Sequence, residues 1–440
     1  MSWKRTLLWA GVVAVAVAVP PTVVGVTRAR SYLDSLYAPA SNTDAPVPTP
    51  AYDPAKPTAV VLVGNEGAHV GDVLDPYETF AATGAFNVYT VAPERKLVPL
   101  TGGLDLVPDF TFAELERRLG GAAPYVVAVP QLPDAEPAAR DALKTWLVRQ
   151  AGSGALVLGI CVGVEVVASA GLLAGRAATS HWFRLGKLED AYPEVHWQRA
   201  TRYVDDGDVI TTGAVLSGID GALRVIERRL GTTAAADAAK AVGWQHYSPG
   251  APAPLPRTSF GLQDTVAGVN LTFRPRPTIG VVLTEGIGEI ELASFFATYT
   301  EAAYAARTVA LGAGSTAPVR TRHGLTFVPR GDAFVAKVDR LVVPGADAAA
   351  HRLPGLDAEY PQAQPGFPFD AALRDMARTI DVPTARWRAR TLELPASDLT
   401  GVTGPGWPWP ATLTPFLYAL LVLALAGTLR RVLRMRRGQE

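Results

Sequence analysis

The stretch ALVLGICVGVEVVASAGLLAGRAATSHW, residues 155–182, decides the fold of this 440-residue chain. Its apolar start predicts a buried strand over 155–160, and a helix is expected from about 162 to 170. Cys161 stands at the turn between them, where an open parallel sheet presents side chains at its carboxyl edge. The N-terminus of a helix carries free N–H groups and partial positive charge, which favours the reactive thiolate. The alternative is a small, buried, apolar side chain, a common state of free cysteine.

Short apolar runs alternate with helical segments on both sides of this stretch. The predicted strands lie at 59–64, 86–92 and 125–130, with helices at 71–83, 111–119 and 136–150 and a hairpin around Thr101–Gly103. Downstream, apolar runs at 202–204 and 209–211 precede a helix at 217–230. The alternation predicts an α/β domain over 58–231, with a mainly parallel sheet covered by helices on both faces.

The same pattern starts again after a Pro-rich linker, residues 248–277. Four segments, at 278–284, 287–301, 322–330 and 339–347, resemble 59–64, 70–84, 101–109 and 124–132, at offsets between about 214 and 221 residues. So constant an offset predicts an internal duplication, with the second copy at 278–395. No counterpart of ALVLGICVG follows its last helix, at 369–379, so this copy is truncated and lacks a cysteine. Its Glu289, which aligns with Asp72, is expected to be structural.

Two uncharged runs flank this body, at 6–27 and 411–429. Each is long enough to cross a hydrocarbon core of about 30 Å as a helix. Pro20 and Pro21 are expected to kink the first helix or end it early, and a cleaved signal peptide is the alternative for that run. Between this run and the body, residues 38–57 are rich in Pro and Ala and predict a semi-rigid stalk.

The net charge of zero, from 41 basic and 41 acidic residues, hides a segregation of charge. Lys4 and Arg5 precede the first run, and five Arg follow the second. The positive-inside rule then predicts a cell-membrane protein with both termini cytoplasmic, the body on the extracytoplasmic side, and membrane lipid in contact with both ends. The mildly acidic body argues against a nucleic-acid partner. The single cysteine excludes an intrachain disulfide, and the six His show no metal-ligand spacing, so no metal or other cofactor is predicted.

The segment GICVGVEVVASAGLLAGRAATSHW (159–182) resembles the nucleophile elbow of the ThiJ/PfpI family, in the class I glutamine-amidotransferase-like superfamily. The subgroup that it resembles most contains isonitrile hydratases and the amidotransferase-like half of AraC-type regulators. The match rests on AGLLAGRAATSHW (170–182) and on Asp72, which stands four residues before Pro76 as the family's acidic residue does. The resemblance implies a flavodoxin-like fold for the first copy. It also implies pairing, either between the two copies as a pseudo-dimer or as a homodimer.

Carried over residue by residue, the resemblance implies that Cys161 is the nucleophile and that Asp72 is the acid facing it. His181 would be the nearby imidazole, and the backbone N–H of Val162 would be an oxyanion donor. Two plainer alternatives stay open. His181 is also interpretable as a satisfied polar residue beside Trp182, and Asp72 as a first-turn carboxylate that the helix dipole favours.

Three departures from the family pattern bear on function. Val162 replaces the Thr of the isonitrile-hydratase pattern, and Pro130-Gln131-Leu132 replaces the Pro-Gly-Gly that offers a second oxyanion N–H. No His-x-Glu pair follows residue 190, which argues against glutamine amidotransferase activity. Two hypotheses remain. One is a cysteine-dependent hydrolase, hydratase or lyase acting on a small carbonyl, amide or nitrile-like compound. The other is a non-catalytic module that senses a ligand or the redox state, or mediates an interaction.

Overall fold

The computed structural model describes residues 3–39, 49–133, 137–348, 352–363 and 366–437. Its body is organised around a seven-stranded sheet with the strand order β10-β11-β7-β6-β1-β2-β5. All neighbouring strands are parallel except β10 and β11. The strands are β1 (Thr58–Leu62), β2 (Asn87–Ala92), β5 (Phe110–Thr111), β6 (Val126–Val129), β7 (Leu156–Gly159), β10 (Tyr203–Asp206) and β11 (Val209–Thr212). This order confirms the mainly parallel, flavodoxin-like α/β fold.

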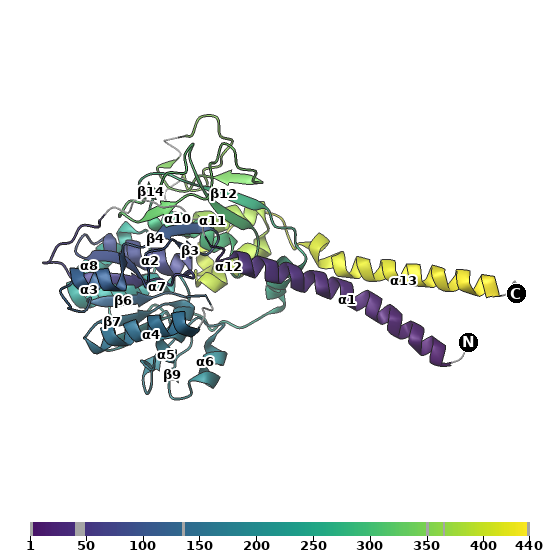
Figure 1. The fold of residues 1–440 in the computed structure, drawn as a ribbon, viewed down its shortest axis with the longest axis horizontal. Helices are drawn as coiled ribbons and strands as arrows, with labels where there is room; N and C mark the ends of the chain where they lie inside the picture. Colours follow the sequence, from purple (N-terminus) through teal and green to yellow (C-terminus); the bar gives the residue numbers. More distant parts are fainter. Residues whose placement is uncertain (1–2, 40–48, 134–136, 349–351, 364–365, 438–440) are drawn as a thin grey trace.

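Helices cover both faces of this sheet because alternate residues of its strands point to opposite sides (Figure 1). Val60 packs with α4 (Pro137–Gly152) and α5 (Val164–Ser169), whereas Val61 packs with α2 (Val70–Ala81) and α7 (Ser217–Leu230). The remaining elements of this part are α3 (Phe112–Arg118), α6 (Leu185–Ala191), α8 (Thr232–Ala241), β8 (Ala177–Ala178) and β9 (His196–Trp197).

Residues 278–395, called the C-terminal unit below, contain a second, three-stranded parallel sheet. Strand β12 (Thr278–Leu283) lies between β13 (Arg307–Gly312) and β16 (Arg340–Val342), just as β1 lies between β2 and β6. The helices of the unit are α10 (Glu289–Tyr299), α11 (Pro368–Thr379) and α12 (Val382–Leu392).

A shared antiparallel sheet and a shared core join the C-terminal unit to the first domain. The sheet has the order β14-β15-β4-β3, in which β3 (Val98–Leu100) and β4 (Leu104–Val107) form the hairpin that was expected around Thr101–Gly103. Strand β4 pairs with β15 (Thr326–Val328), and β14 (Val319–Arg320) completes the outer edge. Beneath this sheet α2 packs on α10, and one hydrophobic cluster runs through both parts. The two parts are therefore one packed body.

Two long helices, α1 (Trp3–Ser35) and α13 (Trp409–Arg437), project side by side from this body and bring both termini to the same end (Figure 1). Both are long and apolar enough to cross a membrane, by length and composition. Of the two expectations for Pro20 and Pro21, an early end of the helix is wrong, because α1 continues to Ser35. Pro20 cannot donate to the carbonyl of Ala16 four residues earlier. The Tyr418 hydroxyl of α13 donates to that carbonyl instead, at 3.2 Å.

The segments predicted as linker and stalk both contact the body. Within 248–277 lie a 3-10 turn (Leu262–Asp264) and α9 (Thr265–Thr272), which packs on α1 and α12. Of the predicted stalk 38–57, residues 40–48 lie outside the described residues. In its described part the N–H of Asp53 donates to Asn87 Oδ1 at 3.0 Å. One further 3-10 turn (Ala396–Leu399) leads toward α13.

Candidate functional site around Cys161

Cys161 occupies a strained turn between β7 and α5. It opens a 3-10 turn, Cys161–Gly163, and its φ of +54° lies in the left-handed region, which costs a non-glycine residue about 1–2 kcal/mol. The turn also packs tightly, because a Cβ on Gly163 would lie 2.2 Å from the carbonyl oxygen of Val129. The hydroxyl of Ser180 donates to the Cys161 carbonyl at 2.8 Å. The chain therefore forms the expected elbow, and the residues around it hold Cys161 in a strained backbone conformation.

The environment of the thiol disfavours its ionisation. Cys161 is 3% exposed. Burial raises the pKa of the Cys161 thiol well above its usual range, and the carboxylates of Asp72 and Glu301 raise it further, although the Val162 N–H opposes them. The expectation that a helix N-terminus would favour the thiolate is therefore wrong for the resting protein. The six-residue α5 begins only at Val164, and its dipole cannot offset burial beside two carboxylates.

Asp72 lies on α2, is fully buried, and keeps one carboxylate oxygen free of hydrogen bonds. Its Oδ2 accepts the backbone N–H of Gln131 at 2.9 Å. Its Oδ1 has no hydrogen-bond partner among the described residues, although His69 Nδ1 lies 3.4 Å away. Within the described ranges no hydrogen bond joins this carboxylate to the Cys161 sulfur. Asp72 is nevertheless the carboxylate whose charge acts most strongly on the thiol.

His69 and Glu301 belong to this site, and sequence reasoning missed both. His69 caps α2 through its Nδ1, which accepts the N–H of Asp72 at 3.3 Å, and its Nε2 lies 3.4 Å from Glu301 Oε2. Burial opposes the charging of His69, but Asp72 and Glu301 outweigh it and raise the pKa of the imidazole. The N-cap position of His69, three residues before Asp72, is the signal that could have identified it. Glu301 has no such local signal.

His181 is placed close to the site but has no free ring nitrogen. Its Nδ1 accepts the N–H of Phe183 at 3.1 Å, so its Nε2 carries the proton and donates to the Thr391 carbonyl at 2.9 Å. Burial lowers the pKa of His181 to about 4. The ring also stacks on Trp182, with 5.6 Å between centroids. In this arrangement His181 is a neutral, fully bonded imidazole that cannot take a proton from the thiol.

Segments from both ends of the chain enclose the site. Tyr37, which follows α1, packs so closely that a Cβ on Gly67 would lie 2.6 Å from its Cδ1. Its buried hydroxyl has no hydrogen-bond partner within the part of the chain that the structure describes. Arg388 of α12 is 2% exposed and donates to the Ala297 carbonyl, but its Nη2 is unpartnered. Burial lowers the pKa of Arg388 to about 10. Donors and acceptors without partners therefore gather around Cys161.

A small cavity adjoins the elbow. Its volume is about 170 Å³, and Val162, Gly67 and Leu132 are among the residues that line it, together with the charged side chains of Glu165 and Arg184. The cavity has room for a small molecule, and it reaches the elbow through Val162 rather than through Cys161 itself.

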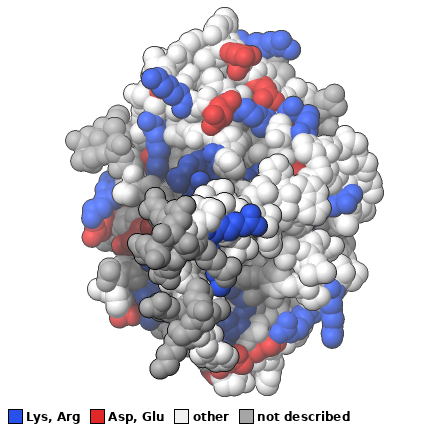
Figure 2. All heavy atoms as spheres, turned by 90° about the vertical axis from the view of Figure 1, so that its right-hand side faces the viewer, with Lys and Arg blue, Asp and Glu red and all other residues white. Residues whose placement is uncertain are grey.

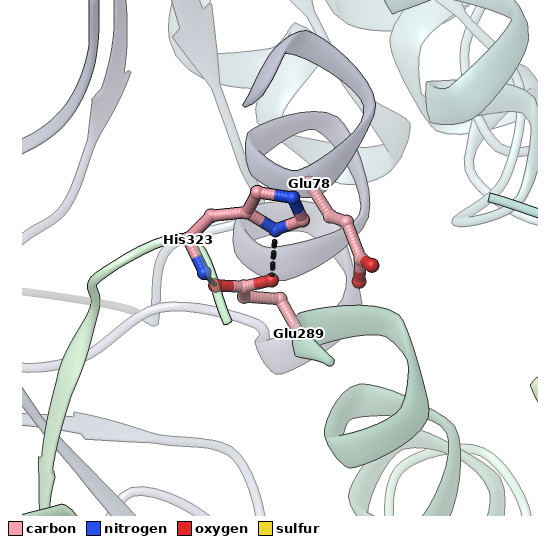
Figure 3. A group of neighbouring side chains, drawn as sticks. All are labelled: Glu78, Glu289 and His323. Carbon is pink, nitrogen blue, oxygen red and sulfur yellow. Dashed lines mark hydrogen bonds and ion pairs between the residues drawn. The ribbon is translucent and has the colours of Figure 1, made fainter. Parts of the chain in front are cut away.

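A second group of titratable side chains, Glu78, Glu289 and His323, joins α2 to the C-terminal unit (Figure 3). Their ligand atoms lie within 4.8 Å of one another, a grouping that metal-ligand spacing along the sequence did not reveal. His323 Nδ1 contacts Glu289 Oε2 at 2.7 Å, and Glu78 Oε2 accepts the N–H of Ile290 at 2.6 Å. Burial, with the charge of Glu289, raises the pKa of Glu78 to about 7. Because Glu289 bonds His323 and Glu78 accepts a backbone N–H of α10, we assign the group a structural role between the two parts.

Together the fold and the site define an α/β protein with a buried cysteine at a strand-to-helix elbow. The chain belongs to the DJ-1/PfpI family, whose model matches residues 57–228. It is 31% identical over 186 residues to isonitrile hydratase of Pseudomonas putida, a match that covers 41% of this chain and 75% of that protein. The family resemblance of the elbow segment is thereby confirmed.

Other similar proteins match a smaller share of this chain or have a lower sequence identity. The HTH-type transcriptional regulator GlxA of Rhizobium meliloti is 37% identical over 92 residues, which span 21% of this chain and 28% of the regulator. A THiJ/PfpI family protein from Pseudomonas syringae is 24% identical, with a TM-score of 0.37 over 48% of this chain and 84% of that one. DJ-1beta of Drosophila melanogaster is 20% identical, with a TM-score of 0.35 over 42% and 96% of the two chains.

Proposed function

We propose that this chain is a cysteine-dependent hydrolase, hydratase or lyase that acts on a small carbonyl, amide or nitrile-like compound. One observation carries the proposal. Cys161 is held at φ +54°, and Asp72, the carboxylate that acts most strongly on its thiol, keeps a buried oxygen that no described residue bonds. Backbone strain of this kind persists where the surroundings enforce it and clusters at functional sites.

In the proposed reaction, Cys161, Asp72 and the N–H of Val162 each have one role. The Cys161 sulfur attacks the electrophilic carbon of the substrate and forms a C–S bond, while the Asp72 carboxylate takes the thiol proton. The N–H of Val162, which favours negative charge on the sulfur, would stabilise the charge that develops next to the new bond. As the C–S bond forms, a π bond of the attacked group breaks and the substrate takes up the proton from Asp72; with an amide, the amine then leaves. Water attacks the same carbon, the C–S bond breaks, and a proton from this water restores the thiol. Because the resting thiol is protonated, a base within the site is needed for the attack.

The similarity to isonitrile hydratase supports a substrate of this chemical class, although Val162 and Gln131 predict a different individual compound. We expect the purified chain to convert at least one member of a panel of isonitriles, small amides and reactive aldehydes. Cys161→Ser should lower kcat/KM for that compound by about 10³-fold or more, since it removes the nucleophile. Ser153→Ala, at an exposed position after α4, is the matched control and should leave turnover unchanged. Turnover by Cys161→Ser at the wild-type rate would refute the assignment.

A second function is the sensing of a ligand or of oxidation, without catalysis. The high pKa of the thiol and the fully bonded His181 both disfavour an activated nucleophile and so support a non-catalytic protein. Of the two forms, ligand sensing fits these observations better, because peroxide reacts with the thiolate. The same experiment separates it from the first. If the wild-type chain leaves the whole panel unchanged, dilute peroxide can be added and the protein analysed by mass spectrometry with a sulfenic-acid trap. Formation of a sulfenic acid, with peroxide reduced to water, would support redox sensing. An unmodified Cys161 would leave ligand sensing, which binding of the panel compounds measures directly.

We also propose that α1 and α13 cross the cell membrane, with both termini cytoplasmic and the body outside. The support is their length, their apolar side chains exposed to the surroundings, and the five Arg near the C-terminus. Their antiparallel packing also brings both termini to one end (Figure 1). Viewed from the side of the two helices, the molecule displays more Lys and Arg than Asp and Glu (Figure 2).

Fusions with topology reporters test this orientation. A phosphatase that is active only outside the cytoplasm should be inactive when fused after Glu440 and active when inserted at the exposed Gly250 loop of the body. A fluorescent protein that folds only in the cytoplasm should show the reverse pattern. Active phosphatase at the C-terminus would overturn the proposed topology.

Finally, we propose that the C-terminal unit is a truncated second copy that pairs with the first as an internal pseudo-dimer. One support is the placement of β12 between two parallel neighbours, like that of β1. The other is the pairing of β4 with β15, in which Leu106 lies opposite Phe327. These two residues are equivalent in the sequence alignment of the copies, and self-equivalent contacts are typical of a two-fold interface.

A further inference from the structure

We infer that Glu301 of the C-terminal unit is a positioning residue of the Cys161 site, so that the unit without a cysteine completes the site of the domain that has one. The inference deepens the proposed function and rests on it in taking Cys161 as the reacting group. It starts from the hydrogen bonds that hold Asp72 in place.

Asp72, His69 and Gln131 of the first domain form a closed ring of hydrogen bonds. The N–H of Gln131 donates to Asp72 Oδ2 at 2.9 Å, and the N–H of Asp72 donates to His69 Nδ1 at 3.3 Å. The N–H of His69 in turn donates to the Gln131 carbonyl at 2.9 Å. These bonds fix the backbone of the ring, but they leave the Gln131 amide group and the Nε2 of His69 without a partner from the first domain.

Glu301 contacts both of these remaining groups with one carboxylate. Its Oε1 accepts from Gln131 Nε2 at 2.6 Å, and its Oε2 lies 3.4 Å from His69 Nε2. The side chain is 23% exposed, and among the carboxylates acting on the Cys161 thiol its charge is second only to that of Asp72. Glu301 therefore bridges the two residues that position Asp72 and also acts on the thiol through its charge.

The turn that carries Glu301 is strained and braced from three sides. Ala302 and Tyr304 have φ values of +62° and +51°, each at a cost of about 1–2 kcal/mol for a non-glycine residue. The indole of Trp387 on α12 donates to the Ala302 carbonyl at 2.7 Å, and Asn270 of α9 donates to the Ala303 carbonyl at 3.0 Å. The Tyr32 hydroxyl of α1 donates to the Ala306 carbonyl at 2.8 Å. A turn kept in this conformation by three helices is typical of a functional position rather than of a simple connection.

Removal of the Glu301 charge tests the inference through the ionisation of the thiol. The full-length chain contains a single cysteine, so iodoacetamide labelling followed by mass spectrometry reports on Cys161 alone. In Glu301→Gln the amide keeps an acceptor for Gln131, but the negative charge is lost. We expect the labelling profile to shift to lower pH and the rate at pH 9 to rise by about threefold or more, which corresponds to half a pKa unit. Glu301→Ala should also lower kcat for an accepted substrate, with partial rescue by Glu301→Gln.

The control is Glu285→Gln, which neutralises an exposed carboxylate of the same unit that accepts the N–H of Arg320. Its labelling profile should match that of the wild type. If Glu301→Gln does not fold, Glu301→Asp withdraws the carboxylate by one methylene and should shift the profile in the same direction by a smaller amount. A folded Glu301 variant with the wild-type profile would overturn the inference. Because labelling needs no turnover, a chain that fails to act on any substrate can still pass or fail this test.

Discussion

Asp72→Asn is expected to lower turnover by about 10²- to 10⁴-fold while making the Cys161 thiol easier to alkylate. The two effects have opposite signs because they arise from different properties of the carboxylate. The negative charge of Asp72 raises the pKa of the thiol, so its loss shifts the labelling profile to lower pH. The same carboxylate is the proton acceptor in the proposed attack, and a positioned general base contributes about 10²- to 10⁴-fold.

Asparagine is well matched to this position, since its amide oxygen can still accept the N–H of Gln131. The measurements are kcat/KM for an accepted substrate and the pH dependence of iodoacetamide labelling. Asp75→Asn is the matched control, because Asp75 is a buried carboxyl on the same helix. Burial raises the pKa of Asp75 well above its usual range, and Asp75 is not among the carboxylates whose charge acts most on the Cys161 thiol. If Asp72→Asn loses turnover without any shift in labelling, the charge of Asp72 does not act on the thiol as described.

Gly163→Ala is expected to destabilise the protein by at least about 3 kcal/mol, or to prevent folding. A Cβ at this position would lie 2.2 Å from the Val129 carbonyl oxygen and 2.5 Å from the carbonyl carbon and oxygen of Pro130. Insertion of one methyl group into a packed interior typically costs 1–3 kcal/mol, and more where the obstructing atoms cannot move. Here they are backbone atoms at the end of the central strand β6, so the elbow itself would have to shift.

Urea denaturation of the purified variant, or its yield of folded protein, measures this effect. Gly186→Ala is the control. Gly186 lies in helix α6 with no atom within 4 Å of an added Cβ, so alanine should stabilise the protein by about 0.5–1 kcal/mol through helix propensity. A Gly163→Ala variant as stable as the wild type would mean that the turn does not have the close packing described here.

The local hydrophobic pattern was sufficient to predict most helices and strands of the first domain. The helix expected at 217–230 coincides with α7, and the strand expected at 155–160 contains β7, because hydrophobic periodicity is set by neighbours along the chain. Whether the first helix ends at Pro20 was not predictable in this way. The helix continues to Ser35, and Tyr418 of α13 bonds the carbonyl that Pro20 leaves free, a contact between the two ends of the chain that no local pattern encodes. The same limit applies to Glu78, Glu289 and His323, which come together only because α2 packs on α10.

By itself, the sequence determined where the cysteine stands, since an apolar strand, a glycine-bounded turn and the family's elbow segment are all local features around Cys161. It also pointed to Asp72. Only the tertiary structure decided the chemical state of these groups. The thiol is protonated at rest because folding buries it beside two carboxylates, one of which, Glu301, comes from the other half of the chain. Desolvation and charge act through space in a medium of low dielectric constant, so their effect depends on distances that no local pattern encodes.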